Sequence, residues 1–156
     1  MTTHAAIESD NVTVDPKRLM LRHTLATLRY RAEKAISGLP PEFGVFRNND
    51  ATRTPVEILA HLGDLLDWAN SLARGIHRWQ DSTPLTWNEE LSRFRAGLTQ
   101  LDLYFASNEP LGFPAERLFQ GPIADALTHV GQIAMLRGMA GNPLPGENYF
   151  KAEIVP

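Results

Sequence analysis

Four segments of the chain carry apolar residues at helical spacing, and each begins with residues that favour a helix start. The first covers residues 16–36 and follows Asp15, which can cap it ahead of a proline at the first helical position. The second follows Thr54 and the third follows Thr86, each with a glutamate three positions later, the pattern of a capping box. The fourth covers residues 121–137. This pattern predicts an all-α fold, an up-down four-helix bundle with a short extended C-terminal tail.

The remaining segments are expected to connect these helices within one domain. A chain of 156 residues is long enough for a substantial core. We therefore expect residues 15–156 to form a single bundle domain behind a flexible N-terminus, residues 1–14. Residues 111–120 predict a loop or a short hairpin, and the tail from residue 147 is apolar enough to lie across the bundle. Because long bundle helices often leave an apolar face for a partner, we also expect a homodimer.

The fourth segment carries polar side chains that packing alone does not require. We expect Pro122 at its first helical position, where a missing N–H costs nothing. Beyond it, Asp125, His129 and Gln132 form a polar row at i, i+4 and i+7 beside the apolar stripe. Side chains four residues apart lie one above the other on a helix, so Asp125 and His129 would point the same way. Two ligand-capable groups on one helix face predict half of a metal site.

The other half is expected from His61, which lies on the apolar face of the second segment. A lone histidine there more often satisfies a hydrogen bond than binds a metal ion. Metal sites in helical bundles, however, are built from inward-pointing side chains on facing helices. If the two helices are neighbours, His61, Asp125 and His129 could hold Zn²⁺, Fe²⁺, Ni²⁺ or Mn²⁺. In the competing arrangement, the Asp125 carboxylate hydrogen-bonds one of the imidazoles and no ion is needed.

Other polar and aromatic residues also have candidate roles. Gln132 could hydrogen-bond a ligand or line the mouth of the site, or it could be an ordinary surface amide. Asp64, one turn after His61, could hold that imidazole in one tautomer. The three tryptophans, Trp68, Trp79 and Trp87, are assigned to the core or to an interface rather than to a cofactor.

The composition of the chain excludes some kinds of site and argues against some kinds of partner. The chain has no cysteine, which excludes thiolate nucleophiles, disulfides and cysteine zinc sites. A net charge of −3 without a basic run argues against a nucleic-acid surface. No apolar run approaches the ~20 residues of a membrane helix, and the first residues lack a signal-peptide pattern. We therefore expect a cytoplasmic protein with a small-molecule substrate and with neither a nucleic acid nor a membrane as partner.

Two stretches resemble the DinB-like (YfiT-like) superfamily of metal-dependent enzymes. Residues 55–68 are similar to the second helix of that family, and residues 129–137, running into Gly-Asn-Pro, are similar to its fourth-helix signature. The likeness covers residues 17–141. It implies a four-helix bundle in which three histidines hold a divalent ion, one from the second helix and two from the last. The matching positions here are His61, Asp125 and His129, so an aspartate stands where the family has a histidine.

This departure from the family pattern bears on function. A carboxylate ligand would add negative charge and make the ion a weaker Lewis acid; alternatively, Asp125 would only orient His129, in a site that binds metal poorly or has lost it. The resemblance implies a thiol-dependent transferase or isomerase that uses a low-molecular-weight thiol, or a small hydrolase with metal-bound water as nucleophile. The alternative is a non-catalytic binding or stress-associated bundle.

Overall fold

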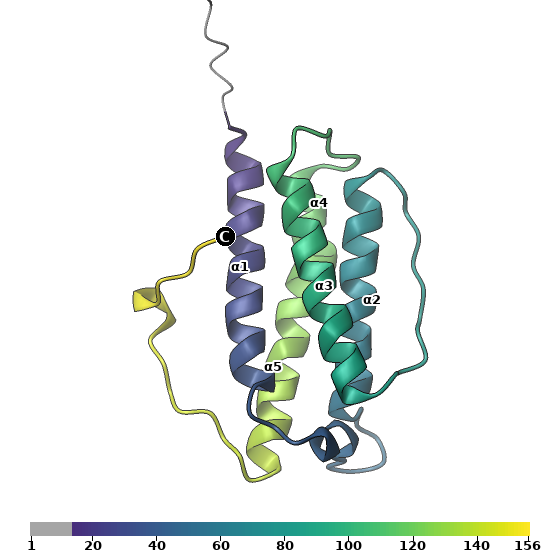
Figure 1. Cartoon of the computed structure of the whole chain (residues 1–156), viewed down its shortest axis with the longest axis vertical. Coiled ribbons are helices and arrows are strands. Elements are labelled where there is room, and N and C mark those ends of the chain that lie inside the picture. Colours follow the sequence, from purple (N-terminus) through teal and green to yellow (C-terminus); the bar gives the residue numbers. More distant parts are fainter. Residues whose placement is uncertain (1–13) are drawn as a thin grey trace, which may run out of the picture.

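The computed structural model describes residues 14–156, and over this range it contains helices and connecting segments but no strand (Figure 1). The expected all-α bundle of four packed helices is confirmed, whereas the expected flexible N-terminus falls almost entirely outside the described residues. The four long helices are α1 (Pro16–Ile36), α2 (Pro55–Ala73), α3 (Trp87–Ala106) and α5 (Ala124–Met139). The shorter ones are η1 (Pro41–Val45), α4 (Ala115–Leu118), η2 (Phe119–Ile123) and η3 (Tyr149–Lys151).

Three of the four long helices start where capping residues predict. The Asp15 side chain accepts a hydrogen bond from the backbone N–H of Lys17 at 2.9 Å. Thr54 and Thr86 each form the full capping box, in which the threonine accepts from the N3 backbone and the N3 glutamate accepts from the threonine backbone. Each such cap typically contributes about 1 kcal/mol, which is enough to fix where a helix begins.

The start of α5 differs from the prediction. Residues 111–120 do not form a hairpin, because α4 lies within them and continues into the π-helical turn η2. Pro122 lies inside η2, and α5 begins only at Ala124, so the expected first-position role of Pro122 is wrong. A proline lacks the N–H needed by the α-helical ladder, and a wider turn absorbs this defect without ending the helical run.

The helix directions differ from the up-down order that the sequence analysis expected. α2 and α3 run in the same direction, whereas α1 and α5 run in the opposite one (Figure 1). Contacts between α2 and α3 agree with this, since Arg93 reaches Asp64 and, further toward the C-terminus of both helices, Asn70 donates to the Gly97 carbonyl. Residues 74–86 must therefore return along the length of α2 before α3 begins (Figure 1). This long connection brings its side chains alongside the middle of α2.

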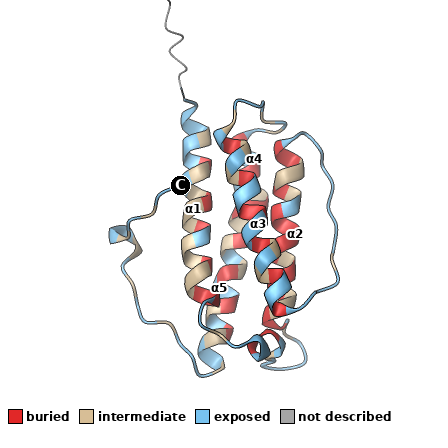
Figure 2. Cartoon of the chain, viewed as in Figure 1, coloured by how far each residue is buried: buried red, intermediate tan, exposed pale blue. Residues whose placement is uncertain are grey.

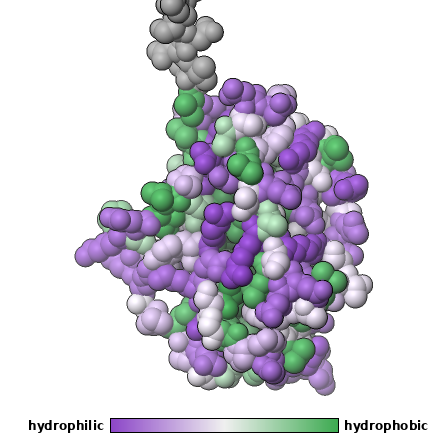
Figure 3. Space-filling view, in the orientation of Figure 1, coloured by the Kyte–Doolittle hydropathy of each residue, from purple (hydrophilic) through white to green (hydrophobic). Residues whose placement is uncertain are grey.

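The core lies where the inward faces of the four long helices meet (Figure 2). Leu28, Leu59, Phe94 and Ile133, one from each long helix, are completely buried. Outside this core, ion pairs such as Arg22–Asp102 and Arg95–Glu33 join α1 to α3. The face formed by these two helices is accordingly mostly hydrophilic (Figure 3).

The C-terminal tail leaves the end of α5 and runs back alongside α1, mostly extended apart from η3 (Figure 1). The Tyr149 ring packs edge-on against Tyr30 at 6.3 Å between ring centroids, and the Arg31 guanidinium lies 3.8 Å from the centre of the Tyr149 ring. Glu147 pairs with Lys34. The tail is therefore attached to α1 near Tyr149.

Among the helices of the described range, none combines the length and apolar character needed to cross a membrane.

Candidate metal centre

The three predicted ligands come together between α2 and α5. His61 lies in the second turn of α2, and Asp125 and His129 lie in the first two turns of α5. α5 packs antiparallel against α2, and α4 and η2 extend its helical run back to Ala115, so Asp125 and His129 lie near the middle of that run and face His61. Each residue offers one ligand atom, and all three atoms lie within 4.8 Å of one another. The imidazole rings of His61 and His129 are 4.5 Å apart between centroids and nearly perpendicular, at 84°.

The spacing of these atoms fits shared ligands better than hydrogen-bonded partners. His61 Nε2 lies 3.6 Å from Asp125 Oδ2, and His129 Nε2 lies 3.5 Å from Asp125 Oδ1. A nitrogen-to-oxygen hydrogen bond would bring these atoms to about 2.7–3.2 Å. The two separations involve different oxygens of Asp125, so an ion with bonds of about 2.0–2.2 Å could be shared by either imidazole and the carboxylate. The carboxylate therefore stands between the two imidazoles without a normal hydrogen bond to either, in positions from which all three residues could hold a metal ion.

Gln132 determines which nitrogen of His129 is free to bind. His129 Nδ1 lies 2.8 Å from Gln132 Oε1. An amide oxygen can only accept a hydrogen bond, so Nδ1 carries the proton and donates it. Nε2 is then left with its lone pair directed toward Asp125 and His61, which is the tautomer that a metal ligand requires. This contact with His129 is distinct from both sequence readings of Gln132.

His61 is the more enclosed end of the site, with a side chain 17% exposed. Burial lowers its pKa, as do the neighbouring His129 and the positive charge of Arg53, whereas Asp125 acts in the opposite direction. The net shift keeps His61 neutral near pH 7, and only the neutral imidazole can bind a metal ion. The opposite end is open, because the Asp125 side chain is 47% exposed.

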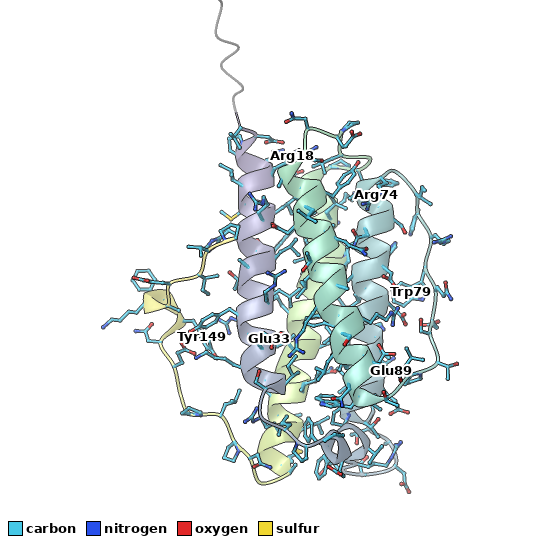
Figure 4. All side chains as sticks on the ribbon, viewed as in Figure 1. Arg18, Glu33, Arg74, Trp79, Glu89 and Tyr149 are labelled. Carbon is cyan, nitrogen blue, oxygen red and sulfur yellow. The ribbon has the colours of Figure 1, made fainter. Side chains whose placement is uncertain are left out.

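Trp79 covers one side of His61, a position that sequence analysis did not anticipate. Its ring packs edge-on against His61, with 5.6 Å between centroids, and also against Trp68 at the same distance. Trp79 belongs to the connection of residues 74–86 and is labelled beside α2 in Figure 4. Trp79 is 39% exposed, so it is not part of the core, and its ring packs against the candidate site. Helical periodicity carries no signal for a loop residue of this kind.

Asp64 does not reach His61. Its carboxylate accepts hydrogen bonds from the Ser82 backbone N–H at 2.9 Å, the Ser82 hydroxyl at 2.6 Å and Arg93 at 2.5 Å. Burial alone would raise the pKa of Asp64, but the hydrogen bonds from Ser82 and Arg93 outweigh it and hold that pKa below its ordinary value. Asp64 therefore anchors the connection that carries Trp79 and acts on His61 only through it.

A cavity of about 440 Å³ opens beside His129. Its walls come from the segment before α2, from α2 itself and from α5, and the lining residues are Thr52, Arg53, Ile58, His129, Gln132, Met135 and Leu136. The candidate centre thus combines three metal-capable side chains, an exposed approach past Asp125 and an adjoining cavity large enough for a small molecule.

Comparisons of the sequence with protein-family models, with curated proteins and with solved structures give no match. What the site does must therefore be inferred from its own chemistry.

Proposed function

We propose that this protein is a divalent-metal-dependent enzyme of the DinB-like type, with His61, Asp125 and His129 as the protein ligands. The observation that carries the proposal is the 3.5 and 3.6 Å spacing between the carboxylate oxygens and the two imidazole nitrogens. The three side chains are partly exposed, so the argument rests on their convergence: one ligand atom from each lies within 4.8 Å of the other two. A shared cation would bind all three at once.

The three ligand side chains limit which metal ions the site could bind. Two imidazoles and one carboxylate with open positions suit Zn²⁺ and the first-row ions Fe²⁺, Ni²⁺ and Mn²⁺. When bound, such an ion would supply Lewis acidity to a water molecule or to a substrate thiol. The chain contributes the remaining functions: Gln132 keeps His129 in the binding tautomer, and Trp79 shields one side of His61.

We further propose that the reaction is either thiol-dependent transfer or isomerisation, or hydrolysis of a small substrate. The chain has no cysteine, so a reacting sulfur would have to arrive with a low-molecular-weight thiol. The similarity of residues 55–68 and 129–137 to the DinB-like pattern supports the same classes. A cytoplasmic location and a homodimeric state belong to this proposal as well.

The alternative function is a non-catalytic binding or stress-associated bundle that has lost its ion. The observation that favours it is the aspartate at the position where the DinB-like pattern has a histidine.

Metal analysis of protein purified without an affinity tag distinguishes the metal-dependent enzyme from the non-catalytic bundle. After incubation with Zn²⁺ and removal of excess ion, we expect about one ion per chain, as three protein ligands at one site predict. His61→Ala should abolish the bound metal. His23→Ala is the matched control, because His23 is an exposed histidine of α1 remote from the site, and it should keep the full content. Less than about a tenth of an ion per wild-type chain, with Ni²⁺ and Mn²⁺ as well as Zn²⁺, would remove the enzymatic proposal and leave the non-catalytic one.

A further inference from the structure

The cavity beside His129 has one cationic wall. Arg53 lines it, and the guanidinium of Arg53 forms no ion pair and no hydrogen bond with any residue in the range 14–156. Arg47, the neighbouring arginine, is committed elsewhere: it donates to the Thr52 carbonyl at 3.0 Å and lies 3.8 Å from a Glu57 carboxylate oxygen. No acidic residue is among the lining residues. The cavity therefore presents an exposed guanidinium that forms no ion pair, with the Glu57 carboxylate as a counter-charge at longer range.

A second polar group faces the same space. The Gln132 side chain uses its oxygen to accept from His129, and its amide nitrogen makes no hydrogen bond within the described part of the chain. That N–H₂ group is a donor beside the candidate metal centre. The Arg53 guanidinium and the unpaired amide nitrogen of Gln132 both offer donors, which favours a ligand that carries acceptor oxygens.

The rest of the wall is apolar. Ile58 and Leu136 are buried and form its inner surface, while Met135 is exposed at its edge. A methionine in such a position adapts to ligands of different shape because its side chain is unbranched and polarizable. A volume of about 440 Å³ accommodates a small organic molecule.

We propose that this cavity is the substrate-recognition subsite of the metal centre and that it binds an amphipathic carboxylate. The carboxylate pairs with Arg53, the apolar body lies against Ile58 and Leu136, and the far end of the molecule extends past His129 toward the metal ligands. This assignment rests on the proposed function for its catalytic meaning, although the binding it describes requires only the cavity.

A carboxylate fits better than a phosphate. A single planar guanidinium matches the two oxygens of a carboxylate in a fork-to-fork contact. Phosphate sites usually add several backbone N–H groups at a helix start. The start of α2 does not offer these, because its first position is a proline and the Glu57 N–H already donates to Thr54.

The test compares hexanoate with its uncharged isostere hexanamide, by ligand-observed NMR titration of Zn²⁺-loaded protein. We expect the wild type to bind hexanoate about tenfold more tightly than hexanamide, the effect of one charge-assisted contact. Arg53→Gln should reduce this preference to within about threefold. Arg47→Gln is the matched control, because Arg47 lies in the same segment but outside the cavity, and it should retain the wild-type preference.

The variant His61→Ala distinguishes binding of the carboxylate to Arg53 from binding to the metal ion. If the preference for hexanoate persists in His61→Ala and still disappears in Arg53→Gln, the subsite stands even if the chain binds no metal. If the preference disappears in His61→Ala and persists in Arg53→Gln, the carboxylate binds the ion directly and the proposal is overturned. Equal losses in Arg47→Gln and Arg53→Gln would also overturn it, since the effect would then be general charge rather than a subsite. The absence of any hexanoate binding would do the same.

Discussion

At the scale of single residues, Asp125 distinguishes this site from a three-histidine site. Its two carboxylate oxygens each face a different imidazole, at 3.6 Å from His61 and 3.5 Å from His129. A negative ligand partly neutralises a divalent ion and lowers its Lewis acidity. The chain would then favour substrates whose reacting group needs positioning more than strong activation.

Substitution of Asp125 tests whether the carboxylate is a ligand. Asp125→Asn keeps the shape and removes the charge, so we expect Zn²⁺ affinity to fall by about 10- to 100-fold. Asp125→His should restore most of it, since an imidazole at i−4 from His129 recreates the three-histidine set. Competition with a chromophoric chelator measures both. An unchanged affinity in Asp125→Asn would mean that Asp125 lies outside the coordination shell.

At the scale of elements, the site depends on a connection as well as on two helices. Residues 74–86 carry Trp79 onto His61, and they are attached to the bundle through Ser82 and Leu85. Ser82 is held by Asp64, and the backbone N–H of Leu85 donates to Glu90, whose side chain is completely buried. Arg93 supplies the positive charge that both carboxylates need.

Removing Arg93 should therefore be costly. Arg93→Met leaves the carboxylates of Asp64 and Glu90 buried without a cation, and we expect the free energy of unfolding to fall by about 3 kcal/mol. Arg95→Met is the control on the same helix, since the Arg95–Glu33 pair is solvent-exposed and should contribute at most about 1 kcal/mol. Urea unfolding measures both variants. Equal losses would show that the buried cluster has no special role.

Much of this architecture follows from local sequence signals. Thr54 and Thr86 with their glutamates predict the starts of α2 and α3, because a capping box is decided by side chains within one turn. The i, i+4 spacing of Asp125 and His129 likewise predicts a shared face. The start of α5 was predicted wrongly from Pro122, because a residue without an N–H suits either the first position of a helix or a π-helical turn.

Features that depend on contacts distant in sequence were not predictable in this way. Trp79 lies in a loop without periodicity, and its contact with His61 depends on α2 and α3 running parallel. Asp64 could have faced either His61 or α3, and only the packing of Arg93 and Ser82 decides for α3.

At the scale of the whole molecule, metal binding should couple to stability. The candidate ligands come from α2 and α5, which lie far apart in the sequence, so only the folded chain presents them together. With free Zn²⁺ at 100 times its Kd, linkage predicts about 2.7 kcal/mol of added stability. For a domain of this size, this amounts to a rise in Tm of about 5–10 °C.

Thermal unfolding with and without a chelator measures this rise. The wild type should lose it on chelation, His61→Ala should show none, and His23→Ala should behave as the wild type does. A Tm that responds equally to Zn²⁺ in the wild type and in His61→Ala would place the binding elsewhere on the chain.

The most direct test of the account is X-ray absorption spectroscopy of the Zn²⁺-loaded wild type, with His129→Gln for comparison. We predict two imidazole ligands per ion, with nitrogen and oxygen donors at about 2.0–2.2 Å, and loss of the bound Zn²⁺ in His129→Gln, as in His61→Ala. A wild-type spectrum with fewer than two imidazoles, or a His129→Gln spectrum identical to it, would contradict the claim that His61, Asp125 and His129 share one ion.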